Sequence, residues 1–151
     1  MEPIGRAQIG ILLPNPVYPE YLTIEHIPKP ETLDIKAAPR VVQLWGEVFS
    51  AQSRADIMAQ LESSPGWVRE DCTNPPSPNY VCLGVFRYNA MFEAADDPPR
   101  KKHIQSFKLD VDLASIDVSI KAAVVRVLHN YGQIYTCLYR LRLHGQTIAT
   151  T

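Results

Sequence analysis

The sequence has few of the features that mark enzymes and nucleic-acid-binding proteins. Its 151 residues include 7 glycines, and none of them lies in a glycine-rich phosphate-binding loop. The formal net charge is −1, which provides no electrostatic attraction to nucleic acid or to an anionic membrane surface. No pair of histidines has metal-ligand spacing with an acid nearby, so we interpret them as ordinary surface or core residues. The histidines are His26, His103, His129 and His144.

Groups suited to acid–base or nucleophilic catalysis are also scarce. Neighbouring acids occur at Asp96 and Asp97 and at Asp110 and Asp112. The first pair lies in a predicted turn and the second on a polar strand face, where solvated charges are the better interpretation. Cys137 lies among apolar residues, which disfavours a reactive thiolate. We therefore predict that the chain is not an enzyme.

The three cysteines are too few and too widely spaced for a zinc site. Cys72, Cys82 and Cys137 form no Cys-x-x-Cys pair. In a reducing compartment all three would be free thiols. In an oxidising lumen one pair could close into a disulfide and leave one thiol over.

Long hydrophobic runs are absent as well. The apolar run at residues 9–13 is far shorter than the roughly 20 residues that a membrane-spanning helix needs. Glu2 and Pro3 stand where a signal peptide would have basic residues. We therefore expect any membrane anchor to lie outside this chain. The length suits one domain that buries roughly two-thirds of its unfolded surface.

Short runs of alternating apolar and polar residues recur between turns rich in proline, glycine and asparagine. In residues 21–27, for example, Leu22, Ile24 and His26 share one face. Short alternating strands separated by turns are typical of an antiparallel β-sandwich. The predicted strands are residues 7–13, 21–27, 40–48, 80–88, 107–113 and 122–129, and residues 14–19 are a predicted proline-rich turn.

Residues 50–79 depart from this pattern and predict an insertion in the sandwich. A capping-box pattern at Ser53 and Asp56 precedes apolar residues at helical spacing. It predicts a short helix near residues 53–63. The proline-rich run at residues 74–79 predicts a stiff linker with little capacity for hydrogen bonds.

The last predicted strand has unusual contents. Asn130 and Gly132 give a turn signal, and a period-two pattern follows from residue 135. We therefore predict a hairpin in which this strand returns beside residues 122–129. The residues on its apolar face are Tyr135, Cys137, Tyr139, Leu141 and Leu143.

Two blocks of the sequence resemble the SUN-domain family. The first reads Leu-Thr-Ile-Glu-His-Ile-Pro-Lys at residues 22–29, followed by Ala-Ala-Pro at residues 37–39. The second begins with the Asn-Tyr-Gly turn at residue 130, continues through Tyr-Thr-Cys-Leu-Tyr-Arg and ends with Leu-His-Gly at residue 145. The family usually has Trp at the position of Tyr131. Since both blocks occur in the family's order, the chain looks like a SUN domain of a fungal-type inner-nuclear-membrane protein, with a jelly-roll-like β-sandwich fold.

The resemblance implies that His26, Tyr135 and Tyr139 bind peptide. In the family, the matching residues help to form a pocket for the C-terminal carboxylate of a KASH peptide. A carboxylate that leaves water needs hydrogen-bond donors, each worth ~1.5–3 kcal/mol, and hydroxyl and imidazole groups supply them. Ala37 stands where the family has a pocket serine, so one donor is lost or replaced by water. The simpler alternative is that the tyrosines and the histidine are core residues with backbone partners.

The resemblance also assigns structural positions and boundaries. Cys137, Asn130, Gly132 and Gly145 match structural residues of the family signature. The family's disulfide joins the cysteine matching Cys137 to one upstream, and the matching region of this chain has none. The similar region is residues 1–145, the C-terminal two-thirds of a SUN domain, with an insertion at about residues 50–79 and a tail at residues 146–151. The family's cation-binding loop lies upstream, so we expect no cofactor in this chain.

The function that the resemblance implies is capture of the C-terminal peptide of a KASH protein across the perinuclear space. The expected location is the inner nuclear membrane, and the full-length protein is expected to be a homotrimer that couples the nucleus to the cytoskeleton. One alternative is a SUN-like endoplasmic-reticulum protein that aids the folding of client proteins. Another is a carbohydrate-binding jelly roll. Neither nucleic acid nor a direct membrane contact is expected.

Overall fold

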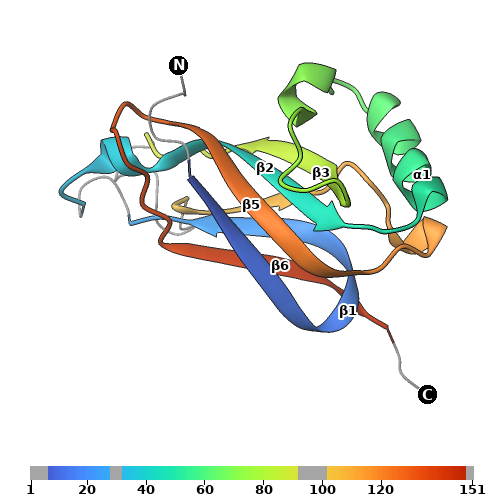
Figure 1. The fold of residues 1–151 in the computed structure, drawn as a ribbon. Helices are drawn as coiled ribbons and strands as arrows, with labels where there is room; N and C mark the ends of the chain where they lie inside the picture. The colour runs from blue at the N-terminus through green and yellow to red at the C-terminus, as the bar shows by residue number, and fades with distance from the viewer. Residues whose placement is uncertain (1–6, 28–31, 92–101, 149–151) are drawn as a thin grey trace.

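The structure is a computed structural model, and it describes residues 7–27, 32–91 and 102–148 (Figure 1). This part of the chain is mainly antiparallel β-sheet. The strands are β1 (Ala7–Glu25), β2 (Pro39–Glu47), β3 (Tyr80–Arg87), β4 (Ile104–Lys108), β5 (Ile120–Asn130) and β6 (Arg140–Thr147). The helix is α1 (Ala51–Glu62), and the 3-10 turns are η2 (Ile35–Ala37), η3 (Arg69–Cys72) and η5 (Ala114–Ile116).

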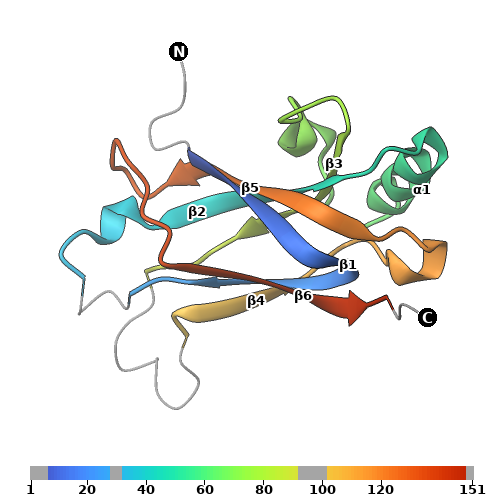
Figure 2. The same ribbon diagram turned by 60° about the horizontal axis from the view of Figure 1, so that its bottom comes forward.

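Strand β1 contributes to two layers because it bends in the middle. Its first half, residues 7–12, pairs with β5, which is followed by β2 and β3. Its second half, residues 17–25, pairs with β6 on one side and with β4 on the other. The register shifts between Leu12 and Val17, where Pro14 and Pro16 interrupt the ladder. Figures 1 and 2 show β1 (blue) turning back on itself at this bend. The predicted turn at residues 14–19 is therefore a bend within one strand.

The hydrophobic core lies between the two layers. Leu22 and Ile24 of β1, Leu44 of β2 and Val125 of β5 are buried in it. Because alternate residues of a strand point to opposite faces, the period-two pattern places Leu22, Ile24 and His26 together on the inner face. Burial of each large apolar side chain contributes roughly 1.5–3 kcal/mol. The predicted class, an antiparallel β-sandwich with one short helix, is confirmed.

The helix begins earlier than the sequence pattern indicates. Its N-cap is Ser50, whose hydroxyl accepts a hydrogen bond from the backbone N–H of Ser53 at 3.2 Å. The capping box that we predicted at Ser53 is therefore wrong by almost one turn. Ser50 takes the role because its extended backbone directs the side chain at the free N–H groups of the first turn. Ile57 and Leu61 bury the inner side of α1 against the core.

A disulfide joins η3 to the sheet. Cys72, at the end of η3, is bonded to Cys82 of β3, with 5.8 Å between the two Cα atoms. Cys137 is a free, exposed cysteine. The sequence left open which pair could close, and the structure shows a pairing that holds η3 on β3.

The segment that we predicted as a strand over residues 107–113 follows a different path. Strand β4 ends at Lys108, and Leu109, Val111 and Leu113 then point into the core without a regular ladder. The backbone N–H of Leu109 donates to the carbonyl oxygen of Glu20 at 2.9 Å. The alternating apolar and polar residues therefore predict correctly which side chains are buried. The predicted strand pairing beyond Lys108 is wrong. The turn predicted around Asp96 and Asp97 lies outside the described residues.

Candidate functional site

The loop after β5 is organised by the side chain of Asn130. Its Oδ1 accepts from the backbone N–H groups of Gly132 at 3.0 Å and of Gln133 at 3.1 Å. Its Nδ2 donates to the backbone carbonyl oxygens of Gln133 at 2.9 Å and Tyr135 at 2.8 Å, and to the hydroxyl of Thr136 at 3.1 Å. Gly132 has φ +120°, a conformation that L side chains rarely adopt. These contacts fix the loop at residues 130–136.

This loop is hydrogen-bonded to η2 rather than to a neighbouring strand. The backbone N–H of Tyr131 donates to the carbonyl oxygen of Lys36 at 3.1 Å, and that of Cys137 donates to Ala37 at 2.8 Å. Ala37 is fully buried beneath this contact. Figure 1 shows η2 (cyan) at the same end of the sandwich as the loop (orange to red). Two segments far apart in sequence thus form one surface.

The predicted hairpin is wrong. Strand β6 starts only at Arg140, and it pairs with β1 and not with β5. Residues 131–139 instead cross from one layer of the sandwich to the other, because their backbone groups bond to η2 and to Asn130. As a result, Cys137 is exposed, and the side chains of Tyr135 and Tyr139 are 50% and 61% exposed. They do not lie on the half-buried strand face that we expected.

His26 lies just past the end of β1 and is almost completely buried. Its backbone N–H contacts the hydroxyl of Tyr88 at 3.1 Å and the carbonyl oxygen of His103 at 3.3 Å. Its ring Nδ1 lies 3.0 Å from the carbonyl oxygen of Ile27. Because a carbonyl oxygen only accepts, Nδ1 carries the proton in this contact. His26 is therefore fixed in position by several backbone contacts.

The structure brings the predicted peptide-binding residues to one end of the sandwich. The last pair of the β1–β6 ladder is Glu25 with Arg140, and His26 and Tyr139 are the next residues beyond this pair. Ala37 contacts the loop that carries Tyr135. Among the described residues, however, no hydrogen bond joins the His26 ring to either tyrosine hydroxyl. Whether these residues bind a ligand stays a prediction.

Two polar residues at this end were missed by the sequence analysis. The hydroxyl of Tyr135 donates to Oδ2 of Asp34, and Nε2 of Gln133 donates to the same oxygen at 2.9 Å. These two hydrogen bonds hold the pKa of Asp34 below its ordinary value. The same contact with Asp34 raises the pKa of Tyr135. No local pattern indicates this contact, since Asp34 and its partners are about a hundred positions apart.

Gly145 permits the closest approach of β6 to β1. A Cβ atom at this position would lie 2.0 Å from the carbonyl oxygen of Tyr18 and 2.7 Å from Cα of Pro19. The register of the two strands shifts here, between Pro19 and Tyr21. Steric crowding against β1 thus explains why a residue without a side chain stands at this position.

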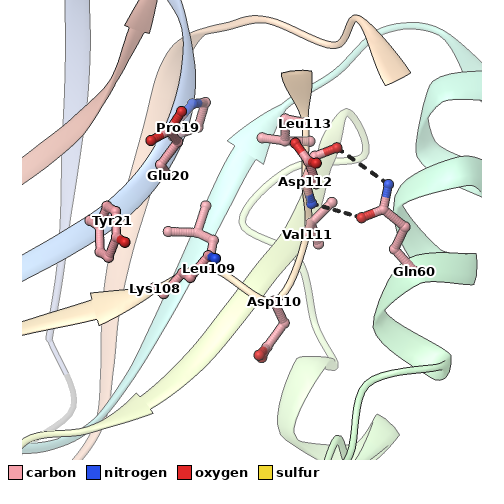
Figure 3. Close-up of a pocket in the computed structure, with 10 residues that line it drawn as sticks. All are labelled: Pro19, Glu20, Tyr21, Gln60, Lys108, Leu109, Asp110, Val111, Asp112 and Leu113. Atoms are coloured by element: carbon pink, nitrogen blue, oxygen red, sulfur yellow. Dashed lines mark hydrogen bonds between the residues drawn. The ribbon is translucent and has the colours of Figure 1, made fainter. Parts of the chain in front are cut away.

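A separate groove of about 440 Å³ is lined by residues 19–21 of β1, by Gln60 of α1 and by residues 108–113 (Figure 3). Gln60 of α1 bridges it: Nε2 donates to the carbonyl oxygen of Asp112 at 3.3 Å, and Oε1 accepts from the N–H of Asp112 at 2.7 Å. None of the predicted peptide-binding residues lines this groove. Its hydrogen bonds attach α1 to the segment that follows β4.

The described part of the chain offers no metal centre. No group of three His, Cys, Asp or Glu side chains among these residues could hold a metal ion. Within the same residues, none of the helices has the length and the apolar character required to cross a membrane.

The fold and this site together define a β-sandwich domain with polar side chains gathered on loops at one end. A solved structure of a SusE-like protein has the same kind of fold, with a TM-score of 0.53 over 96% of this chain and 72% of that chain. The two sequences are 13% identical, so the likeness concerns the fold alone.

The sequence comparisons define the family. The model described as Sad1 / UNC-like C-terminal matches residues 69–147, more than half of the chain, and the chain therefore belongs to this family of SUN-domain proteins. Mus musculus SUN domain-containing protein 5 is 28% identical over 148 residues, which cover 93% of this chain and 28% of that protein. Mus musculus SUN domain-containing protein 3 is 28% identical over 144 residues, which cover 95% of this chain and 34% of that protein. The chain thus spans about a third of these relatives. SUN-domain proteins are proteins of the nuclear envelope.

Proposed function

We propose that this chain belongs to a luminal binding module that captures the C-terminal peptide of KASH proteins. The module would bridge the inner and outer nuclear membranes and couple the nucleus to the cytoskeleton. In the full-length protein it would form a homotrimer, with the membrane anchor outside this chain. Its peptide-binding residues would be His26, Tyr135 and Tyr139, with Ala37 beneath them.

The observation that supports this proposal most is the convergence of the two family-like blocks. The block that contains His26 and Ala37 and the block that contains Tyr135 and Tyr139 meet at one end of the sandwich. Backbone hydrogen bonds from Tyr131 and Cys137 hold them together. A peptide site built from rigid segments loses little entropy on binding, which favours affinity.

The exposed tyrosines suit this role chemically. Tyr135 and Tyr139 are exposed residues, so a terminal carboxylate can reach them without rearrangement of the core, although it meets Asp34 at the Tyr135 hydroxyl. Hydrogen bonds between such donors and a carboxylate are charge-assisted and stronger than neutral ones. A core tyrosine with a backbone partner would be expected to be buried, as Tyr88 is.

The disulfide supports a location in an oxidising compartment. Bonds such as Cys72–Cys82 persist in secreted and luminal domains and are rare in the cytosol. Together with membership of a nuclear-envelope family, this favours the perinuclear side of the inner nuclear membrane.

The proposal is tested by titrating a KASH-protein C-terminal peptide into the chain by calorimetry, once as the free acid and once as the C-terminal amide. We expect the free-acid peptide to bind more tightly than the C-terminal amide. Tyr139→Phe should weaken the binding of the free-acid peptide by about 1–3 kcal/mol. The matched control is Tyr21→Phe, which removes a similarly exposed hydroxyl from β1 outside the site.

The titration should be repeated with the chain fused to a trimeric coiled coil, because the family binds the peptide between neighbouring protomers. We expect tighter binding by the trimer than by the chain alone. Equal affinity of the trimer for the acid and the amide would reject the proposed function.

A further inference from the structure

We propose that Tyr135 and Gln133 form a two-donor site for a ligand carboxylate, and that Asp34 occupies this site as an internal competitor. The inference rests on the proposed function in one respect, which is that the ligand carboxylate is the C-terminus of the captured peptide. It adds one ligand-binding residue, Gln133, and one competing residue, Asp34.

The two donors converge on a single point. The Tyr135 hydroxyl lies 2.5 Å from Oδ2 of Asp34, and Nε2 of Gln133 lies 2.9 Å from the same oxygen. A hydroxyl and an amide N–H directed at one carboxylate oxygen form the donor set that a terminal carboxylate needs when it leaves water. The structure therefore contains a carboxylate site, filled by a carboxylate of the same chain.

The Gln133 side chain and the backbone of Tyr135 are held in place by contacts that do not involve Asp34. Gln133 accepts from the backbone N–H of Ile134 through Oε1 at 3.0 Å, which leaves its NH₂ group to point outward as the donor. The backbone N–H of Gln133 and the carbonyl oxygen of Tyr135 are both bonded to the side chain of Asn130. The loop therefore orients the Gln133 donor and fixes the backbone position from which the Tyr135 hydroxyl reaches Asp34.

The acceptor, Asp34, lies on a partly exposed segment. Asp34 precedes η2 and follows Leu33, whose side chain is fully exposed. The backbone of Asp34 is fixed by two local contacts, its N–H with the Thr32 hydroxyl at 3.3 Å and its carbonyl oxygen with the N–H of Ala37 at 3.2 Å. Besides the two donors, the backbone N–H and the charge of Lys36 act on the Asp34 side chain. An incoming carboxylate can replace Asp34 when that side chain rotates away from the donors and from Lys36.

The electrostatic effect of the contact agrees with this assignment. Hydrogen bonds from Tyr135 and Gln133 lower the pKa of Asp34, so the site favours a negatively charged acceptor. While Asp34 fills the site, a ligand carboxylate must displace an equivalent group, and the two bonds add little to its net affinity. Removal of the internal carboxylate should therefore strengthen binding.

The first experiment uses acetate as the probe and the Gln133 side-chain amide as the NMR reporter. In the chain with Asp34→Ala, the Gln133 NH₂ signals should shift saturably with acetate. In the wild-type chain they should shift at least about fivefold less readily, because Asp34 competes. Absence of an acetate-dependent shift in Asp34→Ala would show that Tyr135 and Gln133 form no carboxylate site, and would overturn the inference.

The second experiment uses the free-acid and amidated KASH-protein peptides with the trimeric fusion. Asp34→Ala should raise the affinity for the free acid about tenfold, or about 1.4 kcal/mol, and leave that for the amide unchanged. Asp56→Asn is the matched control, because Asp56 also accepts from a glutamine amide, that of Gln52 at 2.9 Å, on the distant helix α1.

The outcomes separate the two proposals. A free acid that binds more tightly than the amide, with no gain in Asp34→Ala, rejects the competition by Asp34 and leaves the proposed function standing. An acetate response in Asp34→Ala, with no peptide binding by any variant, supports the carboxylate site and rejects KASH capture.

Discussion

The hydroxyl of Tyr88 lies 3.1 Å from the backbone nitrogen of His26, and it donates to the carbonyl oxygen of His103 at 2.5 Å. One buried side chain on the segment after β3 thus satisfies backbone groups on two other segments. Since His26 is a predicted peptide-binding residue, the position of the site depends on this core tyrosine.

Tyr88→Phe should therefore lower the free energy of unfolding by about 1 kcal/mol, because the carbonyl oxygen of His103 loses the hydroxyl donor and keeps the contact with the N–H of His26 at 3.3 Å. Urea denaturation measures the change. Tyr80→Phe is the control, since the Tyr80 hydroxyl has no hydrogen-bond partner in the described part of the chain and its loss should change little. Equal effects of the two substitutions would contradict the assigned role of Tyr88.

Gly145→Ala should be strongly destabilising, by about 2–3 kcal/mol or more, because the new Cβ would meet the backbone of Tyr18 at 2.0 Å. Backbone atoms cannot move aside as the end of a flexible side chain can. The control is Gly10→Ala on β1, where an added Cβ meets nothing within 4 Å. Thermal unfolding of both variants tests this contrast, and comparable melting temperatures would show that β6 tolerates a shift away from β1.

Reduction of the Cys72–Cys82 disulfide should lower the free energy of unfolding by about 3 kcal/mol in the chain-entropy model for a loop of this size. Alkylation followed by mass spectrometry should find one reactive thiol, Cys137, in the native chain and three after reduction. Cys137→Ser should leave the stability unchanged, because this side chain is exposed. Labelling of Cys72 or Cys82 in the unreduced native chain would contradict the pairing.

The contact between Asp34 and Tyr135 should be lost at both extremes of pH. The folded-state pKa of Asp34 is lowered, so its contribution to stability is present above the ordinary aspartate pKa and disappears as the pH falls through the lowered value. The pKa of Tyr135 is raised, so its contribution is present below the ordinary tyrosine pKa and disappears as the pH rises through the raised value.

Carbon-detected NMR titration of the Asp34 carboxylate measures the acid limb of this dependence. Tyr135→Phe should raise the pKa of Asp34 toward its ordinary value, while the bond from Gln133 retains part of the effect. An Asp34 titration that is the same in both chains would show that the hydroxyl does not contact the carboxylate in solution.

The sequence predicts well those features that depend on local periodicity. Alternation in residues 21–27 places Leu22, Ile24 and His26 on the buried face, and the turn signal at Asn130 and Gly132 marks the end of β5. Two family-like blocks are enough to indicate the family that the comparisons show.

Long-range pairing is where sequence reasoning fails. Adjacent strands joined by a turn commonly pair, but β6 pairs with β1 because the backbone of residues 131–137 bonds to η2 first. Likewise, the alternating residues after Phe107 are buried as predicted, but this segment forms no regular hydrogen-bonded pairing with a neighbouring strand. The contact of Asp34 with Gln133 and Tyr135 joins loops from opposite ends of the sequence, so neither periodicity nor turn chemistry indicates it.

The bend in β1 has a consequence for how the domain folds. Val17, near the start of the chain, pairs with Ile120 of β5 and with Thr147 at the end of β6. Neither layer can be completed until distant parts of the chain have met, and such high contact order slows folding. The bent strand β1 also joins the two layers through one continuous backbone. We therefore expect that when β1 detaches from one layer, it also detaches from the other. We therefore expect hydrogen exchange in β5 and β6 to occur through one shared opening, with the same free energy of protection, that of global unfolding.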